Sequence, residues 1–450
     1  MPRIAFTSPW LSAVATGMLL SGTATAQAPR QTDADHYTRY ELLAPGTAKF
    51  RIVYEVSATT PGATQYFNPI RKGSVASDES VYDRMTGKPL KFAVVNGRVA
   101  AERGVRGADS TGEYIAVDLA RPVPPTGEAR LLIDKTYEDA RSYLAGGDTV
   151  VFTRPLGIKK NAVVLPAGFE LIGVNYPSQV RTEADGRVAV SFMNVGTAEV
   201  PYVVRGRRLR LAGGAGAEGG ATAPSIPPVR GAAEATATRD VARAGATPPV
   251  SPSPSAQPGA VMRDPRLSER ARQDREIVYF LQPPETSAFD LYHDYTESRP
   301  GVDKYLNVVR AGSRASNPSA YILDTGERLG TRTLKGKQIS DAAIDLGQPV
   351  TAETEVVVVD FAAPRQGESV RLRISETYTD PARYRLDGDV LVWDRAFGRP
   401  ANAMVLPRGW YLTNCSVPST VALEADGRVR LDFQNPRNDE ISVLLTARRR

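Results

Sequence analysis

Apolar and polar residues alternate with a period of two along many short stretches of this chain. After the dipeptide Asp426-Gly427, the apolar residues Val429, Leu431 and Phe433 stand at every second position, with charged or polar residues between them. A period of two is typical of a half-buried β-strand, and Asp-Gly is typical of a two-residue hairpin turn. Such signals predict about nine or ten short strands in each half of the chain. In the first half they fall at 48–56, 114–119, 129–137, 149–153, 163–165 and 169–175.

Two of these strands carry further information about their place in a sheet. Thr354–Phe361 contains four consecutive valines, which suits a central strand that is buried on both faces. The last strand of the first half contains Pro201. Because proline cannot donate to a β-ladder, we expect that strand at a sheet edge. Neither half contains a helix of three turns with a clear apolar stripe.

The chain contains one pattern twice. Residues 131–208 and 372–449 align at an offset of 241 without a gap, and 32 of these 78 positions are identical. The preceding segments match less closely at an offset of 239. Such a repeat indicates one domain fold made twice, and each copy is long enough to bury a core of its own.

These patterns predict an all-β protein with two homologous antiparallel β-sandwich domains in tandem, joined by a long disordered linker. The linker is rich in Ala, Gly and Pro and holds almost no large apolar residue, although a short helix is expected at 264–275. The expected organisation is a signal peptide at 1–26, a mobile N-terminal tail at 27–36, β-sandwich repeat 1 at 37–212, the linker at 213–275 and β-sandwich repeat 2 at 276–450.

The first residues have the features of a secretory signal. Arg3 precedes an apolar stretch at 10–20, and Ala24-Thr25-Ala26 fits the cleavage rule for small residues. The apolar stretch is too short to span a bilayer, and no other run approaches the roughly 18 apolar residues that a spanning helix needs. We therefore expect an exported protein, periplasmic or extracellular, without a transmembrane segment after the signal is removed.

Composition is that of an ordinary globular protein, with 42% hydrophobic and 24% charged residues and a net charge of +6. That charge is spread over both repeats and permits only a weak attraction to anionic envelope polymers. The single cysteine, Cys415, leaves no internal disulfide and is expected to be a small buried residue, as are the larger Trp393 and Trp410.

The chain offers few of the residues that strong catalytic motifs need. It has two histidines, His36 in the predicted tail and His293 in a predicted strand, where surface packing is the expected role. Neither a Ser-His-Asp triad nor a zinc site can be assembled from so few residues. Basic clusters at 205–210 and 448–450 lack interleaved aromatic residues, so nucleic acid is not an expected partner. We expect no catalytic residue, metal or cofactor.

The best candidate for a binding site is a set of polar and aromatic residues at the same spacing in both repeats. Aromatic faces stack on sugar rings while carboxylates and amides exchange hydrogen bonds, so the set suits a groove for a sugar or a peptide. The same residues also suit a purely structural role, because they cap turns and satisfy buried loops. The set comprises Tyr137, Asp139, Tyr143, Asp148, Arg154 and Asn161 in repeat 1 and Tyr378, Asp380, Tyr384, Asp389, Arg395 and Asn402 in repeat 2.

Three hypotheses for function follow. The first is a non-catalytic protein that binds or scaffolds an envelope polymer or protein, with two modules acting together through the linker. The second is a hydrolase of envelope glycans or peptides that uses Asp139 and Asp148 as a carboxylate pair. The third is a structural accessory subunit of an envelope complex. The build resembles tandem β-sandwich envelope proteins and, distantly, the accessory β-sandwiches that precede catalytic domains in secreted peptidases, which is a likeness of fold alone.

Overall fold

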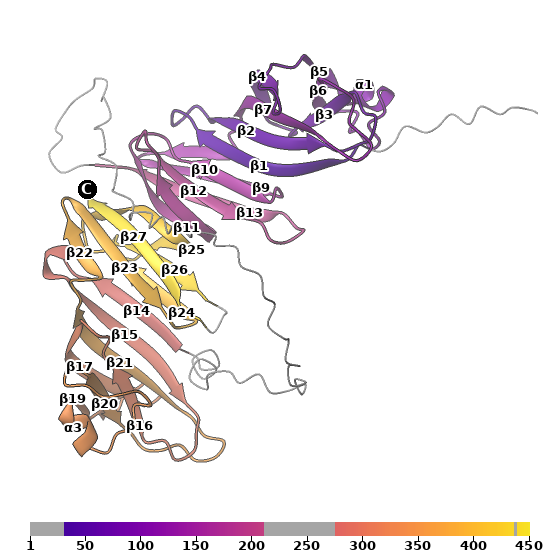
Figure 1. Cartoon of the computed structure of the whole chain (residues 1–450). Coiled ribbons are helices and arrows are strands. Elements are labelled where there is room, and N and C mark those ends of the chain that lie inside the picture. Colours follow the sequence, from indigo (N-terminus) through magenta and orange to yellow (C-terminus); the bar gives the residue numbers. More distant parts are fainter. Residues whose placement is uncertain (1–30, 211–274, 436–438) are drawn as a thin grey trace, which may run out of the picture.

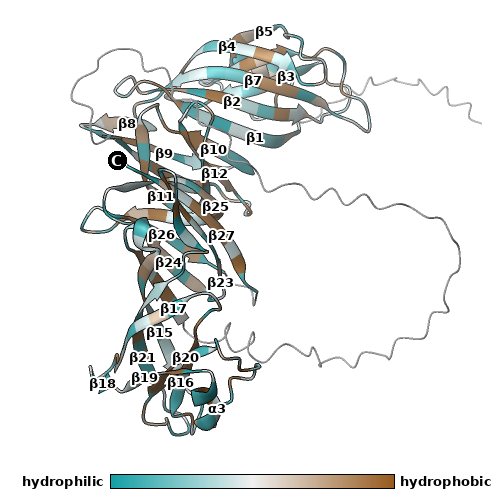
Figure 2. Cartoon of the chain, turned by 60° about the vertical axis from the view of Figure 1, so that its left-hand side comes forward, coloured by the Kyte–Doolittle hydropathy of each residue, from teal (hydrophilic) through white to brown (hydrophobic). Residues whose placement is uncertain are grey.

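The computed structural model describes residues 31–210, 275–435 and 439–450, and almost all of their regular structure is β-strand (Figure 1). This confirms the predicted fold class, with two homologous β-sandwich repeats in tandem. Along the strands, hydrophilic and hydrophobic residues alternate, as the sequence pattern required (Figure 2). The predicted signal peptide and nearly all of the predicted linker, with its short helix, lie outside the described residues.

Repeat 1 consists of one large sheet that folds over on itself. Its strands follow the order β4-β7-β2-β1-β10-β12-β11-β13-β9-β8. Their bounds are β1 (Asp33–Leu42), β2 (Lys49–Ala58), β4 (Val75–Asp83), β7 (Ala129–Glu138), β8 (Tyr143–Gly146), β9 (Thr149–Leu156), β10 (Lys160–Val164), β11 (Phe169–Thr182), β12 (Val188–Met193) and β13 (Val200–Arg208).

Repeat 2 reproduces this order strand for strand, with the two-residue β18 added at one end, as β18-β17-β21-β15-β14-β24-β26-β25-β27-β23-β22. A short 3-10 helix, η1 (Pro284–Thr286), lies between its first two strands. The strands are β14 (Arg275–Leu281), β15 (Ala288–Glu297), β17 (Arg314–Ile322), β18 (Arg328–Leu329), β21 (Val370–Thr379), β22 (Tyr384–Asp387), β23 (Val390–Phe397), β24 (Ala401–Val405), β25 (Trp410–Leu423), β26 (Val429–Gln434) and β27 (Ile441–Arg449).

Each large sheet contains one parallel pair, which the sequence pattern did not predict. β1 runs parallel to β10, with Thr38 opposite Asn161, and β14 runs parallel to β24 in the same way. Alternation reveals which face a side chain occupies but not the direction of the neighbouring strand. These first strands join the two halves of each sheet into one continuous surface.

Aromatic side chains fill the space where each large sheet folds over. In repeat 1, Phe50 on β2 meets Phe152 on β9 edge to face, with ring centroids 5.5 Å apart. In repeat 2, Phe289 and Trp393 occupy the same positions, 5.0 Å apart. Such pairs stabilise a core by about 0.5–1.5 kcal/mol beyond the area that they bury. Trp393 and Trp410 are both buried, as predicted.

A three-stranded sheet covers one side of each large sheet. The predicted central strand of valines is confirmed: Val357 and Val359 face the large sheet, whereas Val356 and Val358 pack on the other side against Ile339. The elements are β3 (Gln65–Ile70), β6 (Glu113–Asp118), β5 (Phe92–Asn96) and the short helix α1 (Gly97–Glu102) in repeat 1, and β16 (Lys304–Val308), β20 (Glu355–Asp360), β19 (Thr331–Lys335) and α3 (Lys337–Asp341) in repeat 2. The strand count per repeat is therefore higher than the nine or ten expected.

The longest strand of each repeat changes partner at its midpoint. The first half of β11 pairs with β13 and the second half with β12, and Pro177 lies between the two halves. β25 does the same with β27 and β26, with Pro418 at the equivalent place. Because proline cannot donate a backbone hydrogen bond, it suits the point at which one ladder ends and the next begins.

β11 and β25 pair with each other in antiparallel fashion and join the repeats (Figure 1). The offset of 241 maps the first of their residue pairs onto the last and the middle pair onto itself, so the contact has approximate two-fold symmetry about that middle pair. The buried core is continuous across it. The pairs are Val174–Val421, Ser178–Ser419 and Val180–Cys415. The repeats therefore form one body rather than two modules with separate cores.

Ion pairing adds to this contact between the repeats. Glu170 on β11 is 1% exposed and accepts hydrogen bonds from Arg207 of its own repeat and from Arg450 of the other. Arg450 Nε lies 3.0 Å from both carboxylate oxygens. Charge-assisted hydrogen bonds are stronger than neutral ones, above all where water is excluded. Arg450 therefore holds the two repeats together through Glu170, and we call this interaction the clamp.

Two positions differ from the sequence expectations. The strand with Pro201 is not at an edge, because β13 lies between β9 and β11. Pro201 stands beyond the last residue pair with β11, where the Asn175 side chain bonds to the Pro201 carbonyl instead. β1 begins at Asp33, so His36 lies in a strand, 2.7 Å from the Ser57 hydroxyl, and not in the predicted tail.

Replacing Arg450 by alanine tests the clamp. R450A leaves the buried Glu170 with one cation in place of two, so we expect the free energy of unfolding to fall by about 1–3 kcal/mol. The matched control is R449A, because Arg449 is 62% exposed and its pair with Glu285 lies at the surface, where such a pair contributes about 0–1 kcal/mol. Chemical denaturation measures both; equal effects of the two substitutions would refute the clamp.

Candidate functional site

The twelve predicted site residues do not line one groove. Asp139 and Arg154 are buried together in repeat 1, and Asp380 and Arg395 are buried together in repeat 2. The distance from the arginine Nη1 to the aspartate Oδ2 is 3.5 Å in the first pair and 3.0 Å in the second. Each repeat thus contains one buried Asp–Arg pair at equivalent positions, and we call this pair the frame of the repeat.

Asp139 organises the turn between β7 and β8. Its carboxylate accepts bonds from the hydroxyls of Ser74 and Ser142 and from the backbone N–H of Arg141. Burial by itself raises the pKa of this carboxyl, but the hydrogen bonds from Ser142 and its neighbours outweigh burial and hold the pKa below its ordinary value. Asp380 takes the equivalent bond from Ser313 at 2.9 Å.

Each buried arginine is surrounded by aromatic rings. Arg154 lies 5.5 Å from the centre of the Tyr137 ring, and Arg395 lies 5.5 Å from Tyr378 and 5.2 Å from Phe289. Burial lowers the pKa of both arginines from their ordinary value. Cation–π contacts and the aspartate offset the loss of hydration, so the guanidinium group remains inside the sandwich.

The second predicted tyrosine and the asparagine of each repeat also have structural contacts. The Tyr143 hydroxyl donates to the Leu43 carbonyl at 2.9 Å, and that of Tyr384 donates to the Gln282 carbonyl. The side-chain nitrogens of Asn161 and Asn402 donate to the carbonyl three residues earlier, at Ile158 and Arg399 respectively. These four buried side chains tie loops to the core.

Asp148 and Asp389 lie apart from the frame, at the tips of the β8–β9 and β22–β23 hairpins. Asp148 pairs with Arg210, and Asp389 is 78% exposed. Six residues of extended strand separate Asp148 from Arg154, which spans roughly 20 Å. A glycosidase pair needs its carboxyls about 5–9.5 Å apart. The structure therefore does not bring Asp139 and Asp148 together as such a pair.

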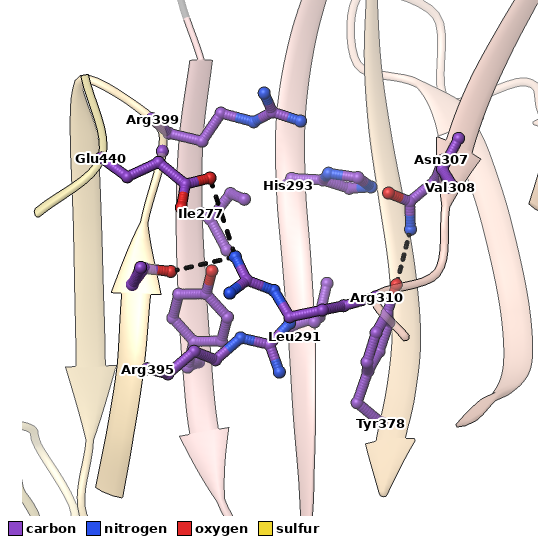
Figure 3. A pocket seen from close by; sticks show the side chains of 13 residues that line it. Ile277, Leu291, His293, Asn307, Val308, Arg310, Tyr378, Arg395, Arg399 and Glu440 are labelled. Carbon is purple, nitrogen blue, oxygen red and sulfur yellow. Dashed lines mark hydrogen bonds and ion pairs between the residues drawn. The ribbon is translucent and has the colours of Figure 1, made fainter. Parts of the chain in front are cut away.

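A cavity of about 140 Å³ opens in repeat 2 beside the frame (Figure 3). β14, β15, β16, β21 and β23 contribute its walls, together with the turn after β23. Three arginines line it, Arg310, Arg395 and Arg399, with one carboxylate, Glu440. Its other lining residues are Ile277, Tyr279, Leu291, His293, Asn307, Val308, Tyr378, Ala396 and Gly398.

Two of the three arginines have partners inside the protein. Arg395 pairs with Asp380, and Arg310 bonds to the Ala396 carbonyl at 3.3 Å and pairs with Glu440 at 3.8 Å. For Arg399, the structure shows no acceptor for the guanidinium group among the described residues, and the side chain extends over the cavity (Figure 3). The cavity therefore carries an excess of positive charge.

A second pocket, of about 510 Å³, adjoins the first and shares Val308 and Arg310 with it. Residues 308–314 form one wall, and Lys335, Glu353 and Glu355 contribute polar groups from β19, from the loop before β20 and from its first residue. A small cavity beside a larger one suits a ligand with a compact end group and an extended remainder.

Buried titratable residues stand behind both frames. Glu376 is 3% exposed and accepts a bond from Asn307 at 2.7 Å, and its Oε1 atom has no partner in the structure. Burial raises its pKa to about 7. Repeat 1 has Lys135 at this position, bonded to Asn68, and burial lowers its pKa to about 7. The two repeats thus hold groups of opposite charge type at one internal position.

Sequence reasoning missed the residues that distinguish this cavity. His293 was expected at the surface, but it is 4% exposed and lines the cavity. The sequence pattern did not identify Arg399 or Glu376 as candidate site residues. The available signal was a difference between the repeats at matched positions. Ile158 stands where repeat 2 has Arg399, and Tyr54 stands where it has His293. Residues that are identical in the two repeats include the frame but not the part of the cavity that is specific to repeat 2.

Comparisons with known proteins leave the family open. No protein-family model matches the sequence, and no curated protein is significantly similar to it. Among solved structures, an M1 zinc metallopeptidase from Deinococcus radiodurans aligns at 12% identity and a TM-score of 0.27, over 40% of this chain and 43% of that one. A putative protease from Parabacteroides distasonis aligns at 12% identity and a TM-score of 0.23, over 39% and 40%. The chain thus spans less than half of each neighbour, and likeness at this level does not bear on function.

Two further observations concern the part of the chain that the structure describes. Within it, no three His, Cys, Asp or Glu side chains are grouped so as to hold a metal ion. Within it, too, every helix is too short or too polar to cross a membrane. Cys415 is buried as predicted, and burial raises the pKa of its thiol.

Stability should depend on pH through Glu376. Below about pH 4.5 the carboxyl is protonated in both states, and between about 4.5 and 7 only the folded state keeps the proton, so the free energy of unfolding falls as pH rises. The fall ends near pH 7. E376Q keeps the shape without the titration, so it should gain on the order of 1–3 kcal/mol over the wild type between pH 5 and 7.5.

Denaturation at several pH values measures this gain. The control is E353Q, because Glu353 is 85% exposed and its substitution should leave the pH profile unchanged. A wild-type profile that matches that of E376Q would contradict the role given to Glu376.

Proposed function

We propose that this chain is an exported, non-catalytic protein that binds or scaffolds a partner at the cell envelope, and that the cavity in repeat 2 takes the ligand. The observation that carries this proposal is the excess positive charge in a formed cavity, with Arg399 extended over it. Arg399 is only partly buried, so it stays hydrated without a ligand, and its charge is available to an anion that enters the cavity.

The joined repeats support a scaffolding role. Because β11 and β25 pair directly, the spacing of the repeats is set by the strand contact and not by the length of the linker. This changes the expected mode of action: the two repeats present their surfaces at a fixed distance instead of searching for sites through a flexible connection. The proposed location, periplasmic or extracellular, rests on the signal at 1–26.

A specific observation favours a second candidate function, that of an accessory subunit. β5 pairs only with β6 among the described strands, and it exposes Phe92 and Val94 along that edge. The equivalent strand β19 is Thr331–Lys335, which is mostly polar. An exposed apolar edge strand offers a partner a place for strand addition. The hydrolase hypothesis gains no such support, since its carboxylates are apart.

Binding to envelope polymers tests the main proposal. The processed chain should be retained by purified envelope polymers, or by a glycan or peptide array, without releasing soluble fragments. Retention without fragment release supports the binding role. Absence of retention on every ligand, or fragment release by the purified protein, would overturn it.

Co-purification from native envelopes tests the second candidate. We expect V94K to lose an envelope partner that the wild-type chain retains, because a charge on an edge strand opposes pairing. L144K is the control, since Leu144 is also exposed but lies on the edge strand β8 of the large sheet. Equal loss of the partner in both variants would contradict strand addition at β5.

A further inference from the structure

We propose that the 140 Å³ cavity of repeat 2 is an oxyanion site, which holds a carboxylate or phosphate group at the end of a larger ligand, with Arg399 as the residue that sets this specificity. This inference deepens the proposed binding function and rests on it.

Two arginines at the cavity wall have guanidinium N–H groups without an acceptor among the described residues. The Arg395 side chain is 8% exposed, lines the cavity, and has a buried Nε–H that finds no acceptor in the structure. A buried donor without a partner is costly, and this Nε–H has no surface open to the cavity, so Arg395 contributes its positive charge to the wall. Arg399 differs from Arg395, which pairs with Asp380, because its whole guanidinium group has no acceptor among the described residues.

Charge gives the class of ligand. Asp380 already neutralises Arg395, and Glu440 faces Arg310, so Arg399 is the surplus cation. Guanidinium groups bind planar carboxylates and phosphates through paired N–H donors, whereas a neutral sugar hydroxyl would leave the charge uncompensated. The Asn307 amide and the Tyr378 hydroxyl add polar groups to the far wall (Figure 3).

The duplication separates ligand binding from folding. Repeat 1 has the same residue types as the cavity wall at five matched positions, Asn68, Arg71, Tyr137, Arg154 and Glu199, so these residue types serve the fold. It does not retain the arginine at 399 or the histidine at 293. Ile158, which replaces that arginine, packs against the core. Because repeat 1 folds without an arginine at this position, Arg399 is not needed for the fold and can serve ligand binding.

Size limits the group that enters. A cavity near 150 Å³ accommodates a ring of about six heavy atoms, so 140 Å³ suits an acidic group with a short carbon or sugar framework. Ile277 and Leu291 supply apolar wall on one side for that framework. The adjoining 510 Å³ pocket, which begins at the shared Arg310, takes the remainder of the ligand.

Calorimetric titration of the full chain with two probes, propionate and inorganic phosphate, tests the site. One probe should bind the wild-type protein, and the tighter one assigns the group as carboxylate or phosphate. R399I, which installs the residue of repeat 1 at this position, should weaken that probe at least ten-fold. R399K should recover only part of the loss, because lysine restores the charge without the paired donors.

The control variant is R408A, because Arg408 is 71% exposed in the turn before β25, pairs with Asp426 and does not line the cavity, so this variant should bind the probe as the wild type does. Circular dichroism and the unfolding midpoint establish that each variant is folded. Equal weakening in R399I and R408A, or no binding of either probe to the wild type, overturns the oxyanion site. If envelope polymers still retain the protein in that case, the proposed binding function stands without the oxyanion site. If they do not retain it, both the oxyanion site and the proposed function are overturned.

Discussion

The antiparallel contact between β11 and β25 is the constraint on which the arrangement of this protein depends. Each strand changes partner at a proline, pairs with two strands of its own repeat, and still offers an edge to its counterpart. An open edge on so long a strand would invite pairing with other molecules. Here the two edges satisfy each other, the apolar cores merge behind them, and Glu170 with its two arginines secures the contact from one side.

The buried Asp–Arg frame orders a turn in each repeat, and in repeat 2 its arginine also lines a cavity. A buried ion pair contributes little net stability compared with apolar residues of the same volume, because both ions lose their hydration. Its retention in both repeats is explained by the turn that it orders, where Asp139 accepts bonds from the hydroxyls of Ser74 and Ser142 and Asp380 from that of Ser313. In repeat 2 the same arginine also forms part of a cavity wall, and the proposed oxyanion site uses its charge.

The sequence predicted the strands well and the connections between them poorly. Alternation identified the buried faces of β12 and β26, and four valines identified β20, because side-chain period and burial are local properties. The parallel β1–β10 pair and the contact between repeats were not predictable, because strand direction and inter-repeat pairing leave no local signature. Similarly, identical residues at matched positions marked the frame, whereas the cavity depended on Arg399 and His293, where the repeats differ.

The near-symmetric meeting at Ser178 and Ser419 has a consequence for evolution and for stoichiometry. Two separate copies of one sequence that met in this way would form a closed dimer with identical sites on both subunits. When the two copies are joined in one polypeptide, their sites no longer have to be identical. One half can keep isoleucine at the position where the other half has arginine, and at the proposed oxyanion site this difference gives each molecule a single binding position with one fixed orientation.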